Sequence, residues 1–168
     1  MSYQEKKVVT SIVTGVLVLA AYCIYVFSRY QSGVVAPGDL KFWALTILIF
    51  IGIGVVASIV IQIVFHILLS ISIAIKKKMQ DEKCDDKEIE KEVEAEMIED
   101  EMDKLIELKS LRPAFLIAGI GFIAALVSLV LKYSPAVMLN ILFISFYIGS
   151  LFEGFAQLYY YRRGLKNG

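Results

Sequence analysis

The chain has 168 residues, of which 58% are hydrophobic, and its mean hydropathy is +0.68. Its 17 basic and 17 acidic residues give a formal net charge of zero. A water-soluble domain is less apolar and a nucleic-acid-binding protein carries a basic face, so we expect a membrane protein with no nucleic-acid partner.

Four apolar runs fill most of the chain. They cover residues 8–28, 42–75, 113–131 and 138–161. Each has at least about 18 residues, enough to cross the ~30 Å hydrocarbon layer of a bilayer as a helix. Because no water is available there to bind backbone groups, the runs must be helices. The sequence therefore predicts an all-α integral membrane protein with four transmembrane helices and membrane lipids as its surroundings.

The first two runs form the predicted N-terminal unit, residues 1–75, as a transmembrane hairpin. Asp39 lies in a turn between the runs and is a suitable N-cap for the second one. The second run would be roughly 50 Å long as a straight helix, too long for a bilayer even when tilted. We expect its last part, Leu68–Ile75, to protrude and pack against protein, although His66 could lie on either side of the lipid boundary.

Residues 76–112 hold nine basic and fourteen acidic residues. This composition favours a charged cytoplasmic helix that links the two halves of the chain. Four acidic residues repeat at every fourth position: Glu88, Glu92, Glu96 and Asp100. The row is either a solvated helix face or a docking surface for a cytosolic or membrane protein partner.

The last two runs form the predicted C-terminal unit, residues 113–168, again as a hairpin. Ser134 and Pro135 supply a cap and a first-position proline for the final helix. Small residues in the second run (Gly52, Gly54 and Ser58) and in the third run (Gly119, Gly121 and Ala125) have close-packing spacing. We expect these two runs to contact each other there.

The basic residues predict the orientation, because Lys and Arg accumulate on the cytoplasmic side of membrane proteins. Of the 17, only Arg29, Lys41 and Lys132 lie in the other two connections. Both termini and the charged block should therefore be cytoplasmic. Five cations next to the runs are expected to contact lipid headgroups: Lys76, Lys77, Lys78, Arg162 and Arg163.

A few polar residues interrupt the apolar runs. Glu153 is the only acidic residue within one, and Gln157 follows it by one helical turn. His66 and Gln62 lie one turn apart in the second run, and we expect a hydrogen bond between His66 and Glu153. Ionisable groups in lipid either join helices or handle protons and cations, and for Glu153 both interpretations stay open.

Two stretches, KCDDKEIEKEVEAEMIEDEMDKLIELKSLRP and EGFAQLYYYRRG, resemble uncharacterised small four-span membrane proteins of bacteria. The resemblance implies a multi-pass protein of the bacterial plasma membrane. Those proteins have no established activity, so it implies no catalytic residue.

The chain carries no Ser/His/Asp set, no HExxH sequence and no phosphate-binding glycine loop, and it has one histidine. We therefore expect no enzyme, cofactor or metal site. The first hypothesis is a regulatory or scaffold subunit that presents the acidic cytoplasmic helix to a partner. The alternative is a small homo-oligomeric transporter or channel that uses Glu153 and its polar neighbours.

Overall fold

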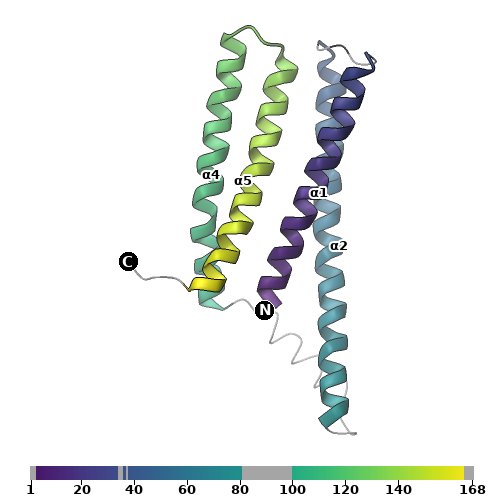
Figure 1. Cartoon of the computed structure of the whole chain (residues 1–168), viewed down its shortest axis with the longest axis vertical. Coiled ribbons are helices and arrows are strands. Elements are labelled where there is room, and N and C mark those ends of the chain that lie inside the picture. The colour runs from purple at the N-terminus through teal and green to yellow at the C-terminus, as the bar shows by residue number, and fades with distance from the viewer. Residues whose placement is uncertain (1–2, 34–35, 37, 81–99, 165–168) are drawn as a thin grey trace.

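The structure, a computed structural model, describes residues 3–33, 36, 38–80 and 100–164, with residues 76–80 as backbone alone. This part of the chain contains helices and no strand. The helices are α1 (Tyr3–Gln31), α2 (Leu40–Gln80), α4 (Glu101–Val130) and α5 (Pro135–Arg163) (Figure 1). All four are long and apolar enough to cross a membrane. The predicted all-helical class with four candidate spans is confirmed.

Most large apolar side chains point away from the bundle. Leu17 is 64% exposed, Leu48 63% and Phe115 73%. A water-soluble protein does not leave so much contiguous apolar surface in contact with water. The exposure is consistent with lipid as the solvent for these helices.

Two of the predicted helix starts are present. The carboxylate of Asp39 accepts a hydrogen bond from the backbone N–H of Phe42 at 3.1 Å and so caps α2. Helix α5 begins at Pro135, directly after Ser134, whose side chain makes no capping bond. The proline needs no N–H partner in this position, which explains why it is tolerated there.

Helix α4 begins earlier than the sequence indicated. It starts at Glu101 and passes through Pro113, so the predicted boundary between linker and span lies inside one helix. Asp100 is its N-cap: the Asp100 carboxylate accepts from the backbone N–H of Asp103 at 2.7 Å, and Asp103 accepts from the Asp100 N–H at 3.2 Å. This reciprocal capping box satisfies two donors that would otherwise lack partners. The predicted linker helix falls mostly on residues 81–99, which lie outside the described residues.

Helix α5 is the centre of the bundle, because it packs against α1, α2 and α4. Glycines allow these close approaches. A Cβ added to Gly149 would lie 2.9 Å from the carbonyl oxygen of Ala114 in α4, and one added to Gly54 in α2 would lie 2.6 Å from the Tyr147 hydroxyl.

The prediction that the second and third apolar runs contact each other is wrong. The main helix pairs within the described residues are α4–α5, α1–α5, α1–α2 and α2–α5. Gly54 and Gly121 contact α5 instead, whereas Gly52 and Gly119 face open space. The prediction of close packing therefore holds for Gly54 and Gly121, whose partner is α5, and fails for Gly52 and Gly119.

We call the end of the bundle where α1 begins and α5 ends the terminal end, and the opposite end the turn end. Near the turn end, Tyr22 is 1% exposed and Trp43 5% exposed. The Tyr22 hydroxyl donates to Asn140 Oδ1 of α5 at 2.7 Å, and the Tyr22 ring packs on Phe143 with a centroid separation of 4.4 Å. These contacts bind α1 to α5.

Helix α2 has 41 residues and extends beyond the other helices at the terminal end (Figure 1). The Tyr3 ring at the start of α1 packs edge-on against Phe65, so everything after Phe65 continues past α1. Within this extension Ile73 is buried, whereas Leu68 and Ile75 stay exposed. The expected packing against protein holds for Ile73 and not for Leu68 or Ile75, and the protrusion from the bilayer stays a prediction.

Candidate functional site

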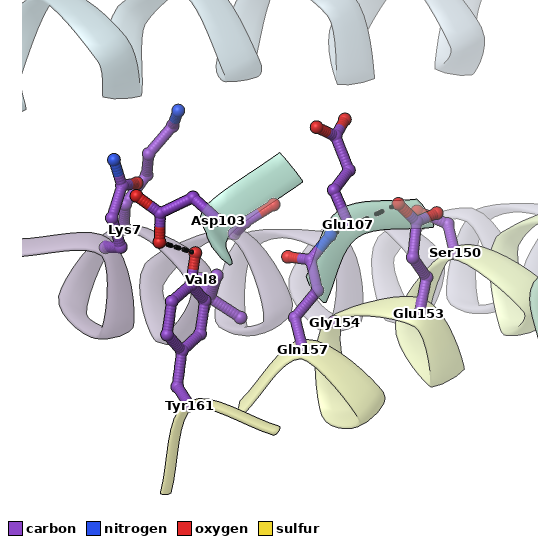
Figure 2. A pocket seen from close by; sticks show the side chains of 11 residues that line it. Lys7, Val8, Asp103, Glu107, Ser150, Glu153, Gly154, Gln157 and Tyr161 are labelled. Carbon is purple, nitrogen blue, oxygen red and sulfur yellow. Dashed lines mark hydrogen bonds between the residues drawn. The ribbon is translucent and has the colours of Figure 1, made fainter. Parts of the chain in front are cut away.

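A polar cleft of about 220 Å³ lies between α1, α4 and α5 toward the terminal end of the bundle (Figure 2). We call it the terminal cleft. Its lining consists of Gln4, Lys7, Val8, Ser11, Asp103, Glu107, Ser150, Glu153, Gly154, Gln157 and Tyr161. The side chains combine three carboxyl groups and several neutral hydrogen-bonding groups with a single lysine.

Helical spacing brings these residues together. On α5, Glu153, Gln157 and Tyr161 follow one another at intervals of four and therefore share a face. On α4, Asp103 and Glu107 have the same spacing. Both rows face the start of α1, and the three helices supply the walls of the cleft.

Hydrogen bonds hold both ends of the cleft. Near one end, the amide nitrogen of Gln157 donates to Glu153 Oε1 at 3.3 Å. Near the other, the Tyr161 hydroxyl donates to Asp103 Oδ1 at 2.9 Å and so joins the end of α5 to the start of α4. Since Asp103 also takes part in the capping box, its carboxylate has little freedom to rotate.

The Glu153 carboxyl group is intermediate in exposure and faces the cleft together with Gln157 and Glu107 (Figure 2). A carboxylate taken partly out of water is stabilised by an opposite charge or by hydrogen-bond donors. Gln157 supplies one donor. The excess of carboxyl groups over lysine makes the cleft suitable for a positively charged ligand.

The structure separates the four polar residues that the sequence grouped. Glu153 and Gln157 line the terminal cleft, whereas His66 and Gln62 are exposed on α2. The expected hydrogen bond between His66 and Glu153 is not formed; within the described residues, Glu153 accepts a hydrogen bond from Gln157 instead. Helix α1 explains the separation, because its first turns line the cleft beside α5 and pack on α2 at Phe65.

Sequence reasoning missed the contributions of α1 and α4. Lys7 was counted only among the basic residues that predict the orientation, and Tyr161 only as the last residue of the fourth apolar run. The available signal was the spacing of Gln4, Lys7 and Ser11 on one face of α1, which matches the repeats of α4 and α5. Without knowing the helix neighbours, that spacing alone does not identify a shared cleft.

The other predicted positions are less informative. Glu88, Glu92 and Glu96 lie outside the described residues, as do the side chains of Lys76, Lys77 and Lys78. Asp100 is not within a helix, contrary to the predicted docking row, because it caps α4. Arg162 and Arg163 are exposed at the end of α5, and the Arg163 guanidinium lies 5.3 Å from the centroid of the Tyr159 ring.

No group of three or more His, Cys, Asp or Glu side chains within the described ranges is arranged to hold a metal ion. Comparisons of the chain with protein-family models, curated proteins and solved structures found no match.

Proposed function

We propose that the protein is a small membrane transporter or channel subunit that binds a cationic solute in the terminal cleft. The observation that carries this proposal is the convergence of Asp103, Glu107 and Glu153 from two helices on one cavity. Among the described residues that line it, Lys7 is the only cationic one. An ammonium or similar cation would find there both negative charge and hydrogen-bond acceptors.

The position of Glu153 along α5 supports a role in moving a cation and not only in binding one. It lies ten residues before Arg163, or about 15 Å from the end of the helix. A carboxylate at that depth is costly in lipid unless a cavity or partner stabilises it, and such residues commonly mark ion and proton pathways. The terminal cleft would give it access to the aqueous side.

The distribution of Lys and Arg supports an orientation with both termini, and hence the terminal cleft, on the cytoplasmic side of a bacterial plasma membrane. The chain would then form two hairpins, with the charged segment between them. A four-helix chain has few walls for a continuous pathway, so we include a homo-oligomer in this proposal.

Uptake of radiolabelled tetramethylammonium into proteoliposomes tests the proposal. We expect pH-dependent uptake that falls at least about tenfold in Glu153→Gln, since removal of a carboxylate charge next to the cation costs on the order of 1–4 kcal/mol of Coulomb attraction. Glu101→Gln is the matched control, because Glu101 is exposed on α4 outside the cleft. Unchanged uptake in Glu153→Gln would remove this residue from the mechanism.

The non-catalytic scaffold role stays a second proposal, supported by the acid-rich sequence of residues 81–107. Its partner would dock on Glu88, Glu92 and Glu96, without Asp100. Deletion of residues 85–99 should then abolish capture of a protein partner from detergent extracts while leaving tetramethylammonium uptake intact. Loss of uptake with unchanged capture would contradict this second role.

A further inference from the structure

A second cavity of about 260 Å³ adjoins the terminal cleft. We call it the inner cavity. It lies between α1, α2 and α5, and its lining is mostly apolar: Ser11, Ile12, Thr14, Gly15, Val18, Ile51, Gly54, Val55, Ser58, Ile61, Tyr147, Ser150, Leu151 and Gly154. Three of these residues, Ser11, Ser150 and Gly154, also line the terminal cleft.

The two cavities follow each other along the bundle. On α1, residues 4–11 line the terminal cleft and residues 11–18 line the inner cavity. On α5, residues between Tyr161 and Ser150 line the terminal cleft, and residues between Gly154 and Tyr147 line the inner cavity. The segment of α1 that lines both is about 21 Å long. Acidic groups therefore lie at one end of this stretch and apolar side chains at the other.

Gly154 forms the junction between the cavities. A Cβ at this position would lie 2.7 Å from Cγ1 of Ile12, so α1 and α5 approach each other closely there. Farther in, Gly15 leaves room for Leu151, and Gly54 leaves room for the Tyr147 hydroxyl. These glycines bring the helices together, while the apolar side chains around them line the inner cavity.

We propose that the ligand of this protein is a cationic amphiphile, with its ammonium group in the terminal cleft and its apolar chain in the inner cavity. This inference rests on the proposed function and specifies its substrate class. Charge decides the orientation of the ligand, because Asp103, Glu107 and Glu153 line the terminal cleft and none of them lines the inner cavity. A simple inorganic cation would leave the inner cavity without a role.

The apolar chain provides a quantitative expectation. Each methylene group moved from water into an apolar cavity tightens binding about fourfold, so a chain of several carbons that enters even in part tightens it at least about tenfold. The comparison of tetramethylammonium with hexyltrimethylammonium isolates this effect, because the two ions share the same charged group.

Val55 and Val56 offer a matched pair of variants. Val55 lines the inner cavity and is 56% exposed, whereas Val56 is 60% exposed and is outside both linings. Both lie at the surface of α2, so a phenylalanine can be accommodated at either position without burial in a packed core. Only Val55→Phe would narrow the inner cavity.

Equilibrium dialysis of the purified full-length protein in a non-ionic detergent tests the inference, with binding to empty micelles subtracted. The wild type should bind hexyltrimethylammonium at least about tenfold more tightly than tetramethylammonium. Val55→Phe should remove most of that difference and leave tetramethylammonium binding unchanged, whereas Val56→Phe should preserve both affinities. Glu153→Gln should weaken the binding of both ions, and uncharged hexanol should bind to the wild type much more weakly than hexyltrimethylammonium.

The opposite outcomes are distinguishable. Equal affinity of the wild type for the two ions, with weaker binding of both ions to Glu153→Gln, would overturn the amphiphile inference but support the cation site. If Val55→Phe and Val56→Phe changed the affinity for hexyltrimethylammonium equally, the inner cavity would have no role in binding. If hexanol bound as tightly as hexyltrimethylammonium, the positive charge of the ligand would have no role. No binding of either ion would contradict the proposed function itself.

Discussion

The hydroxyl group of Tyr22 donates a 2.7 Å hydrogen bond to Oδ1 of Asn140, and the two residues join α1 to α5 close to the turn end of the bundle. Asn140 in turn donates its amide hydrogen to the backbone oxygen of Ala136 at 2.8 Å. Because Tyr22 is almost fully buried, its hydroxyl has no water to replace Asn140. This bond holds α1 against α5, the arrangement on which both cavities depend.

Tyr22→Phe should therefore lower the free energy of unfolding by about 1 kcal/mol, the usual range for a hydrogen bond between membrane helices. A double-mutant cycle with Asn140→Ala, measured by denaturation in mixed micelles, should show coupling between the two positions. Tyr25→Phe is the control, because Tyr25 lies on the same helix and is 37% exposed. Strictly additive losses at Tyr22 and Asn140 would show that the bond contributes nothing.

Two glycines should respond in opposite ways to alanine. Gly149→Ala would place a methyl group 2.9 Å from the Ala114 carbonyl oxygen, which belongs to the backbone and cannot easily move. We expect a loss of about 1–3 kcal/mol from this overpacking. Gly119→Ala meets open space and should be neutral or stabilising by up to ~1 kcal/mol through helix propensity. Thermal unfolding in detergent compares them, and equal effects would contradict the α4–α5 packing.

Asp103 connects two helices, since it accepts hydrogen bonds from the Asp100 N–H and from the Tyr161 hydroxyl. Asp103→Ala should cost about 1–2 kcal/mol, whereas Glu101→Ala in the same helical turn should cost less than about 0.5 kcal/mol. Tyr161→Phe should destabilise the wild type but add little in the Asp103→Ala background. A full additional loss in that background would place the stabilising role of Tyr161 elsewhere.

The proposed orientation rests on the distribution of charge alone and can be measured independently. In a Cys23→Ala background, a membrane-impermeant maleimide should modify Cys84 only after the cells are permeabilised. Tyr133→Cys, placed in the turn between α4 and α5, provides the opposite control and should react in intact cells. Modification of Cys84 from outside would reverse the proposed topology.

The existence and approximate extent of the helices could be predicted because each depends on a local property, an apolar run of sufficient length. Asp39 and Pro135 marked helix starts for equally local reasons, a side-chain acceptor and a missing N–H. The start of α4 was missed because the apolar run begins only at residue 113, after the charged segment, whereas the capping box at Asp100 and Asp103 begins the helix earlier.

The neighbours of each helix could not be predicted, because all four have similar apolar surfaces. Glu153 and Gln157 were identified by their rarity in an apolar run, but His66 was the wrong partner. Choosing Asp103, Glu107 and Lys7 instead requires the knowledge that α1 and α4 flank the end of α5. Glycine positions indicated close packing without indicating which helix would fill the space.

The proposed function depends on the Glu153 carboxyl group, which would hold the cation in the terminal cleft. The most direct measurement is the dissociation constant of tetramethylammonium for the full-length protein and for Glu153→Gln, with Glu101→Gln as the control. We predict saturable binding that weakens at least about tenfold in Glu153→Gln and stays unchanged in Glu101→Gln. Equal affinities for the wild type and Glu153→Gln would contradict a role of Glu153 in cation binding.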